Sequence, residues 1–227
     1  MKEYSCFDIL GPVMVGPSSS HTAGACRLGG IARLVAGGNV KSVKFLLHGS
    51  FARTYKGHGT DRALLAGVLG MRPDDERLPE AFTLAKEAGV EYSYEPTDLG
   101  DVHPNTVRIE ITSSTGHVTT LVGSSTGGGA VLVTQVDDMP VEFTGDYNTL
   151  ITMHLDRPGV VSRVTNGLAA YDVNIAFMRV YRRERGALSC MVIESDQPIP
   201  NELAAYLVRM PGIERAIILP TVGGMVS

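Results

Sequence analysis

The chain has 227 residues, a mass of 24.2 kDa, and a composition of 44% hydrophobic and 19% charged residues. This length allows one domain or two and excludes a large multidomain assembly. The apolar content suffices for a core, which excludes disorder over most of the chain. Lys and Arg total 20 against 24 Asp and Glu, for a net charge of -4. Because no basic excess is present to bind phosphate backbones, we expect no nucleic-acid partner.

The cysteines and the N-terminal segment indicate a cytoplasmic protein. Cys6, Cys26 and Cys190 are far apart and form no C-x-x-C pair, so we expect neither a disulfide framework nor a zinc site. The start of the chain, MKEYSCFDILGPVMVGP, is interrupted by acidic residues and prolines, unlike a secretory signal. No apolar run approaches the roughly 18 residues that a membrane span needs, so no membrane contact is expected.

Residues 1–145 are predicted to form an α/β domain. After Thr22, small and apolar residues recur at helical spacing until Gly37-Gly38. Further along, alternating and β-branched residues predict strands, and Ser114-Thr115-Gly116 predicts a hairpin turn. The expected elements are a helix at 22–36, a strand at 41–48, helices at 60–69 and 78–88, strands at 107–111 and 118–122, a Gly-rich loop (GSSTGGG) at 123–129, and a strand at 130–136.

Residues 146–227 are predicted to form a second domain, because a polar stretch ending at Thr144-Gly145-Asp146 indicates a boundary near residue 145. The expected elements are a strand at 147–155, a helix from 158 to about 171, strands at 173–181 and 187–194, a helix at 201–210, and a strand at 213–219. The order β-α-β-β-α-β is the ferredoxin-like plan, with both helices on one face of an antiparallel sheet. The fold class is therefore α+β. Such small sheets often pair with another copy, so we expect self-association through this domain.

The second domain resembles the ACT family of small-molecule regulatory domains over roughly Leu150 to Leu219, through the segment DRPGVVSRV and the following Val173-Asn174-Ile175. In that family an amino acid commonly binds where the first strand turns into the first helix, at a dimer interface. The resemblance implies an effector site at Asp156, Arg157, Pro158 and Gly159, with Asn174 opposite. Gly159 would let a carboxylate approach backbone amides at the helix N-terminus. The alternative is that Pro158-Gly159 only starts a helix.

The first polar motif of the N-terminal domain is Gly16-Pro17-Ser18-Ser19-Ser20-His21-Thr22. Four hydroxyls surround one imidazole directly before an expected helix. Helix-start amides and hydroxyl donors together can hold a carboxylate or a phosphate. The alternative is a Ser-rich helix cap with a surface histidine.

Two further motifs each place a histidine in a turn. Lys56-Gly57-His58-Gly59-Thr60-Asp61 holds His58 between two glycines, which leaves the ring accessible for proton transfer near neutral pH. Asp101-Val102-His103-Pro104-Asn105-Thr106 places His103 just before a strand. The alternatives are a flexible turn with a solvated histidine and a plain turn before a strand.

The three motifs, taken together and in this order, resemble the β-chain region of the bacterial iron-sulfur L-serine dehydratase family. That family has a G-P-S-S-S-H-T segment, a G-H-G-T-D segment and an H-P-N turn. The Gly-rich segment at Ser125 to Gly129 and the ACT-like domain extend the resemblance over nearly the whole chain. Thr126 departs from it, since a branched aliphatic residue would be expected there, and this leaves the role of the Gly-rich segment open.

The resemblance implies that serine loses its α-proton and its β-hydroxyl and becomes aminoacrylate, which hydrolyses to pyruvate and ammonia. In this family a 4Fe-4S cluster with an open iron takes the hydroxyl. The three cysteines do not resemble the family's cluster ligands: Cys26 lies on an apolar helix face, Cys190 lies inside a strand, and all three read as small buried hydrophobic residues. We therefore expect no metal ligand in this chain and a partner α chain that carries the cluster.

The resemblance also implies roles for single residues. His58 is the first choice for the base that takes the α-proton, with His21 and His103 as the other candidates for proton transfer. Ser18, Ser19, Ser20 and Thr22 would anchor the substrate carboxylate, and Thr60, Asp61 and Asn105 would orient the rings or bind the ammonium group. The histidines that match no motif, His48, His117 and His154, are expected to be structural.

The alternative function is that of a non-catalytic subunit that senses an amino acid. The first domain also resembles the allosteric substrate-binding domain that is joined to an ACT domain in some D-3-phosphoglycerate dehydrogenases. That resemblance concerns the fold and does not account for the three histidine motifs. No G-x-G-x-x-G follows a predicted strand, so no dehydrogenase active site is expected in this chain.

Overall fold

The computed structural model describes residues 13–222, so the expectation for Cys6 lies outside the described residues. Packing divides the chain into two compact units between Asp137 and Asp138. The predicted domains, 1–145 and 146–227, place this division a few residues later. Each unit combines helices with a sheet, which confirms the α+β class. Within the described range no helix is both long and apolar enough to cross a membrane.

A six-stranded mixed sheet of order β2-β1-β3-β4-β5-β6 underlies the predicted site. β1 pairs in parallel with β2 and antiparallel with β3. Along β1 every second side chain, Val43, Phe45 and Leu47, is buried, as the alternating sequence predicts. The strands are β1 (Val40–Leu47), β2 (Glu91–Pro96), β3 (Thr106–Ser113), β4 (Val118–Gly127), β5 (Ala130–Val136) and β6 (Met139–Phe143).

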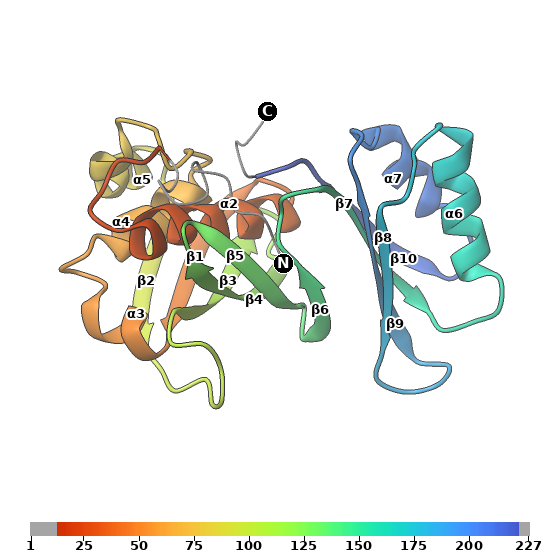
Figure 1. The fold of residues 1–227 in the computed structure, drawn as a ribbon, viewed down its shortest axis with the longest axis horizontal. Helices are drawn as coiled ribbons and strands as arrows, with labels where there is room; N and C mark the ends of the chain where they lie inside the picture. Colours follow the sequence, from red (N-terminus) through yellow and green to blue (C-terminus); the bar gives the residue numbers. More distant parts are fainter. Residues whose placement is uncertain (1–12, 223–227) are drawn as a thin grey trace, which may run out of the picture. The chain divides into compact units, whose positions relative to one another are not determined.

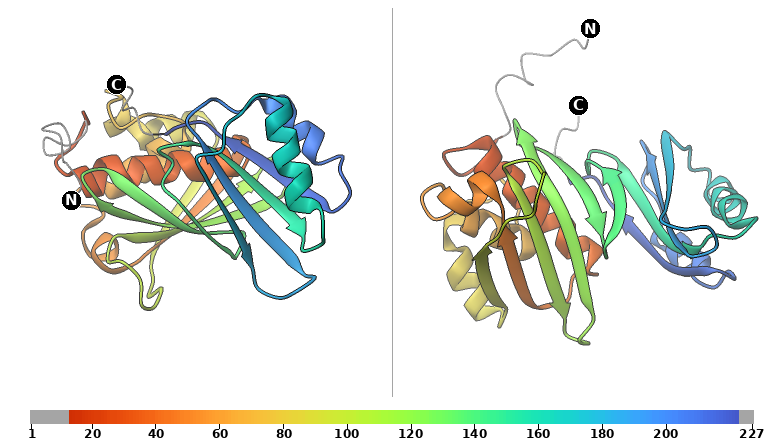
Figure 2. Two further views of the ribbon diagram at one scale, coloured as in Figure 1. Left: turned by 45° about the vertical axis from the view of Figure 1, so that its right-hand side comes forward. Right: turned by 90° about the horizontal axis from the view of Figure 1, so that it is seen from below.

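Helices cover one face of this sheet (Figures 1 and 2). A short π-helix, η1 (Ser19–Gly24), runs directly into α2 (Ala25–Val35), and α4 (Thr60–Val68) packs beside α2. The 3-10 turn η2 (Leu78–Glu80) leads into α5 (Ala81–Glu87). These elements confirm the three helices predicted in residues 22–88.

The contact between α2 and α4 depends on glycines. A Cβ atom added at Gly67 would lie 2.7 Å from the Gly30 backbone nitrogen and against the Cys26 carbonyl. One added at Gly29 would lie 3.0 Å from the Val68 nitrogen. Glycine within a helix costs about 1 kcal/mol relative to alanine, so these positions trade helix propensity for close approach of the two backbones.

Three elements were not predicted from the sequence: the short helix α3 (Gly49–Thr54), the edge strand β2, and β6. The helix α3 is only six residues long, too short for a helical period to show. The strand β2 is exposed along almost its whole length, so its sequence EYSYEP lacks the apolar alternation of a half-buried strand.

The loop predicted at 123–129 is wrong for most of its length. β4 continues through Gly127, and only Gly128-Gly129 turn the chain into β5. The pairing shifts register between Ser125 and Gly127, as in a β-bulge. Gly127 has a φ of 112°, which explains why the segment is rich in glycine although it is a strand.

The second unit has the predicted ferredoxin-like order. Its four-stranded antiparallel sheet has the order β10-β7-β9-β8, and both helices lie on one face (Figure 1). The elements are β7 (Asn148–Leu155), α6 (Val160–Ala170), β8 (Phe177–Arg182), β9 (Leu188–Ser195), α7 (Asn201–Leu207) and β10 (Ile213–Leu219). Leu150, Val164, Leu168, Ile193 and Leu203 are among the fully buried residues between helices and sheet.

We predict that replacing Gly67 by Ala destabilises the chain, although alanine is the better helix former. The added methyl group forces α2 and α4 apart, and overpacking of this kind costs about 1–3 kcal/mol. Urea denaturation followed by circular dichroism measures the change. Gly57→Ala is the control, because the nearest atom to a Cβ there is the Thr54 carbonyl oxygen at 3.7 Å. Equal stability of the two variants would contradict this account.

We also predict that His154 makes the fold sensitive to acid. The ring is 2% exposed, and burial lowers its pKa. The folded chain therefore keeps His154 neutral, while the unfolded chain takes up a proton as the pH falls below about 6.5. Stability should be unaffected above that pH and should fall below it. Between about pH 7.5 and about pH 5.5, His154→Gln should lose less stability than the unsubstituted chain, and an equal loss would contradict the assignment.

Candidate active site

The Ser-rich motif forms the π-helix η1 at the start of α2. Ser18 is its N-cap, and the Ser18 hydroxyl accepts a hydrogen bond from the His21 backbone N–H at 3.2 Å. Ser19 and Ser20 are half-buried in the first turn. Short π-helical segments are rare and are frequent at functional sites.

The His21 ring is held at both nitrogens by serine hydroxyls. Nδ1 lies 3.4 Å from Ser18 Oγ, and Nε2 lies 3.2 Å from Ser50 Oγ. The Phe51 ring packs edge-on against it, with centroids 5.3 Å apart. Burial lowers the pKa of His21, and the neighbouring His58 lowers it further. His21 is therefore a neutral, oriented imidazole at physiological pH.

His58 lies beside His21 but is differently placed. The ring centroids are 4.9 Å apart at an interplanar angle of 61°. His58 is exposed, and within the described chain its ring forms no hydrogen bond, while its backbone N–H donates to the Thr54 carbonyl at 3.0 Å. The two rings are therefore close enough for a charge on one to act on the other.

The H-P-N turn is fastened to its surroundings through its backbone. His103 Nδ1 accepts from the Asn105 N–H at 3.1 Å, so this nitrogen is used within the turn. The Asn105 carbonyl accepts from the Ser125 N–H at 3.0 Å, and the Pro104 carbonyl accepts from the Ser50 N–H at 2.7 Å. The exposed His103 is thus a member of the same hydrogen-bonded assembly as α3 and β4.

Thr60 and Asp61 begin α4, and both are buried. The Asp61 carboxylate accepts from the Arg62 N–H at 2.8 Å, and burial raises the pKa of Asp61. The Tyr94 hydroxyl donates to the Asp61 carbonyl at 2.7 Å and so fastens the start of α4 to β2.

Three buried hydroxyls in this region have no hydrogen-bond partner in the described chain: Thr22, Thr60 and Ser125. A buried polar group without a partner costs about 1–3 kcal/mol. Thr22 and Thr60 were predicted to bind substrate, and in this structure they are 2% and 0% exposed. Their hydroxyls are therefore screened from solvent, whereas Ser18, Ser19 and Ser20 are only half-buried.

Three residues that build this site were not among the predicted site residues: Gly49, Ser50 and Ser125. A Cβ added at Gly24 of η1 would collide with the Ser125 side chain, so the Gly-rich strand packs directly against the Ser-rich motif. Ser50 joins His21 to the H-P-N turn. The available signal was the dipeptide Gly49-Ser50 after a predicted strand, which is typical of a turn into a helix.

Comparison with known proteins decides the family. The family model described as the serine dehydratase beta chain matches residues 5–136, and the ACT domain model matches residues 147–206. The chain belongs to the serine dehydratase beta chain family. Its C-terminal unit is an ACT domain, so both resemblances drawn from the sequence are confirmed.

Full-length relatives agree with this assignment. The chain is 41% identical over 216 residues to the "L-serine dehydratase, beta chain" of Peptoniphilus asaccharolyticus, covering 95% of this chain and 96% of that protein. It is 40% identical over 213 residues to the "Probable L-serine dehydratase, beta chain" of Bacillus subtilis, covering 94% and 96%. A "D-3-phosphoglycerate dehydrogenase" of Methanocaldococcus jannaschii is 28% identical over 193 residues, which cover 85% of this chain but 36% of that protein.

The predicted effector residues of this dehydratase family member do not meet within one chain. The Asp156 carboxylate accepts from the Gly186 N–H at 3.1 Å and from Arg182 at 3.3 Å, beside the start of β9. Asn174 donates its N–H to Gln197 at 2.8 Å, beyond the other end of β9. Asp156 and Asn174 therefore lie at opposite ends of the eight-residue strand β9. They are roughly 25 Å apart, because a strand rises about 3.3 Å per residue. Gly159, with a φ of 85°, caps α6 after the exposed Pro158.

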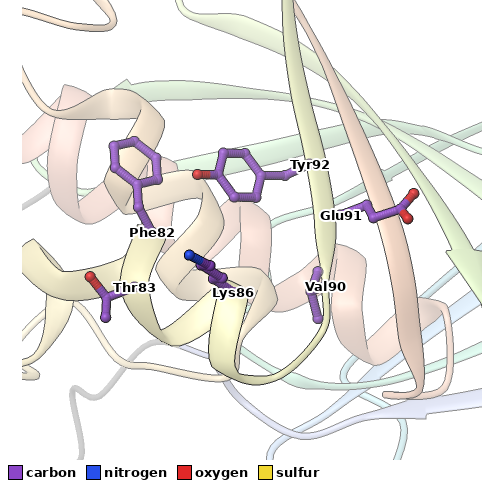
Figure 3. Close-up of a pocket in the computed structure, with 6 residues that line it drawn as sticks. All are labelled: Phe82, Thr83, Lys86, Val90, Glu91 and Tyr92. Atoms are coloured by element: carbon purple, nitrogen blue, oxygen red, sulfur yellow. The ribbon is translucent and has the colours of Figure 1, made fainter.

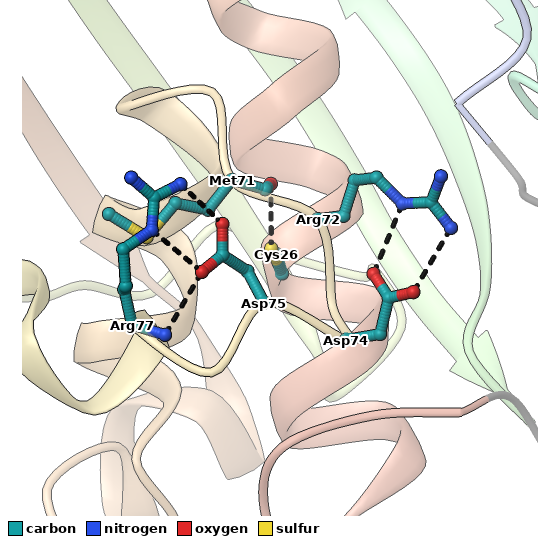
Figure 4. A network of polar contacts seen from close by, with 6 residues as sticks. All are labelled: Cys26, Met71, Arg72, Asp74, Asp75 and Arg77. Carbon is teal, nitrogen blue, oxygen red and sulfur yellow. Dashed lines mark hydrogen bonds and ion pairs between the residues drawn. The ribbon is translucent and has the colours of Figure 1, made fainter.

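The described cysteines of this family member do not fit an iron-sulfur cluster. Cys26 is 1% exposed, its thiol donates to the Met71 carbonyl at 3.3 Å, and burial raises its pKa to about 12 (Figure 4). Cys190 is fully buried. An iron-sulfur cluster is held by several cysteine thiolates that converge on it, whereas the Cys26 thiol is protonated and bonded to a backbone carbonyl. Within residues 13–222 no group of three or more His, Cys, Asp or Glu side chains could hold a metal ion.

A surface depression of about 530 Å³ between α5 and β2 contains none of the residues of the three motifs. Phe82 and Tyr92 stack there with ring centroids 5.4 Å apart, and Lys86 lies beside them (Figure 3). The candidate active site of this dehydratase family member is instead the open surface around His21 and His58.

Proposed function

We propose that the chain is the β subunit of an L-serine ammonia-lyase, a carbon–nitrogen lyase that converts L-serine to pyruvate and ammonia. The observation that carries this proposal is the pair of imidazoles from two separate motifs, with centroids 4.9 Å apart: His21 is half-buried and hydrogen-bonded, and His58 is exposed, with no ring hydrogen bond in the described chain. The family and the names of its full-length relatives support serine as the substrate.

In the proposed mechanism His58 is the base. Its neutral ring takes the α-proton of serine as the Cα–Cβ double bond forms and the Cβ–O bond breaks. The hydroxyl leaves with its bonding electrons and takes up the proton that the imidazole removed from Cα, so that water is released and the base is restored. The resulting aminoacrylate tautomerises to an imine, which water hydrolyses to pyruvate and ammonia. Neutral His21 beside His58 avoids like-charge repulsion when His58 becomes an imidazolium.

The hydroxyls of the Ser-rich motif would anchor the substrate. Ser18, Ser19 and Ser20 lie at the start of a helix, where backbone amides and hydroxyl donors favour a carboxylate. Asp61 and Asn105 would orient the rings or bind the ammonium group, and His103 is the reserve candidate for proton transfer.

The proposal includes a partner α chain that holds a 4Fe-4S cluster. Such a cluster acts as a Lewis acid toward the departing hydroxyl when it is bound. It is assigned to another chain because Cys26 and Cys190 are buried and offer no accessible thiolate. A cytoplasmic location is part of the proposal, since reduced cysteines and a cluster both suit a reducing compartment.

The alternative function is an amino-acid-sensing subunit without catalysis, and the similarity to a D-3-phosphoglycerate dehydrogenase favours it. Anaerobic mixing with a cluster-bearing α chain, followed by a pyruvate assay on L-serine, separates the two. Serine binding by this chain without any pyruvate from the mixture would favour the sensor.

We further propose that the ACT domain self-associates through β8. This strand is at the edge of its sheet, and its exposed apolar side chains include Phe177, Met178 and Val180. A two-fold axis that pairs β8 with β8 of a second copy makes the strands antiparallel. That arrangement would bring Asn174 of the second copy toward the Asp156 turn of the first and complete the predicted effector site.

We predict that His58→Ala lowers the turnover of the two-chain enzyme by about 10²-fold or more, because removal of a general base has effects of this size. Anaerobic pyruvate formation at saturating serine measures it. His117→Ala is the control, since His117 lies in the turn before β4 and belongs to no motif. Near-normal turnover of His58→Ala would rule out His58 as the base.

We predict that Val180→Lys weakens self-association by about 10-fold or more, because a lysine on an edge strand opposes strand pairing. Sedimentation equilibrium of the chain at several concentrations measures this change. Val208→Lys is the matched control: the two valines are both 43% exposed, but Val208 lies at the end of α7. Equal association of both variants would place the interface elsewhere.

A further inference from the structure

We propose that Ser50 is a positioning residue of the active site, which holds the His21 ring in one orientation and one tautomer beside His58. The inference rests on the proposed function, because the pair His21–His58 is the proton-transfer site of that proposal. Ser50 lies outside the three motifs and belongs to α3, the short helix that sequence patterns did not reveal.

The position of Ser50 connects the three histidine motifs. Its Oγ lies 3.2 Å from His21 Nε2 in the first motif, and its N–H donates to the Pro104 carbonyl at 2.7 Å in the third. Its carbonyl accepts from Thr54 Oγ1 at 2.8 Å. The Thr54 carbonyl in turn accepts from the His58 N–H at 3.0 Å in the second motif. Ser50 and its helix α3 therefore link all three histidine motifs.

The backbone around Ser50 is fixed by close contact. Gly49 has a φ of 55°, and a Cβ there would lie 2.6 Å from the Pro104 carbonyl oxygen and 2.9 Å from the Pro104 Cα. Only glycine allows this left-handed conformation and this approach. The Ser50 hydroxyl therefore projects from a backbone that has little freedom to move.

The hydrogen-bonding capacity of imidazole explains why two hydroxyls are needed. A neutral ring has one N–H donor and one acceptor nitrogen, and a hydroxyl can serve either. Ser18 at 3.4 Å and Ser50 at 3.2 Å thus satisfy both nitrogens of His21. The Ser18 oxygen already accepts from the His21 backbone N–H, so its hydrogen is free to point at Nδ1, and Nε2 then carries the ring proton and donates to Ser50 Oγ. Without Ser50, Nε2 loses its partner, and the ring can rotate or change tautomer.

Loss of the Ser50 hydrogen bond to His21 should affect catalysis through His58. His21 lies edge-on to His58, so rotation of the His21 ring changes the surface against which the base is placed. Misplacement of a catalytic group by a fraction of an ångström lowers the rate without weakening substrate binding to the same degree. Loss of Ser50 should therefore lower kcat more than it raises KM.

The first test measures the tautomer directly, on the chain alone. Nitrogen-15 histidine labelling and two-bond nitrogen–proton correlation spectra report which ring nitrogen carries the proton, and His21→Gln assigns the His21 signal. We expect one dominant tautomer in the unsubstituted chain and in Ser50→Thr, and a mixture in Ser50→Ala. The same tautomer populations in Ser50→Ala as in the unsubstituted chain would overturn the proposal.

The second test measures turnover after anaerobic mixing with the cluster-bearing partner. Ser50→Ala should lower kcat by about 10-fold with KM changed by less than about twofold, and Ser50→Thr should restore most of the rate. Ser42→Ala is the matched control, a half-buried serine of β1 outside the site. Unchanged kcat in Ser50→Ala, or equal losses in Ser50→Ala and Ser42→Ala, would overturn the proposal.

Two further controls separate misfolding of a variant, and failure of the proposed function, from failure of the Ser50 proposal. Circular dichroism and thermal unfolding check each variant, and Ser50→Cys, which keeps the volume but donates weakly, replaces Ser50→Ala if that variant does not fold. If no partner produces turnover, the proposed function fails, while the tautomer spectra still decide the role of Ser50.

Discussion

The candidate site depends on one close contact, the approach of Gly49-Ser50 to the Pro104 carbonyl. This contact joins the first turn of α3 to the H-P-N turn without a side chain between them. The Ser50 hydroxyl can then reach His21, and the last turn of α3 presents its carbonyls to the segment that carries His58. Three motifs that are far apart in sequence become one site because a glycine allows two backbones to touch.

Close packing of α2 and α4 has a similar role on the other side of the site. The Ser-rich motif leads into α2 through η1, and His58 lies two residues before the start of α4. The glycines Gly29 and Gly67 let these helices pack backbone to backbone, between the first half of α2 and the second half of α4. Each histidine is therefore next to a helix that packs in the core, although His58 itself lies in an exposed turn. Rigid supports of this kind are what a proton-transfer site needs, since small displacements are costly.

In the ACT domain, local sequence patterns predict the helices and strands, whereas strand pairing decides which residues lie close together. Its element order could be read from the sequence, because each helix and strand has a clear period and clear ends. The proposed effector residues could be located only as a turn and as a segment before a strand. The strand pairing separates Asp156 from Asn174 by the length of β9, which is why the proposed effector site includes a second copy.

The sequence by itself determined the fold class, most elements and the three histidine motifs, because apolar periodicity and turn residues are local signals. It did not reveal α3, which is too short to show a period, or β2, whose exposed side chains lack alternation. It also misassigned Gly123–Gly127 as a loop, because a bulged strand uses the same glycines. Only the tertiary structure decided that Ser50 and Ser125 belong to the site and that Thr22 and Thr60 are buried. Burial and contacts between distant residues arise from packing, which no local pattern specifies.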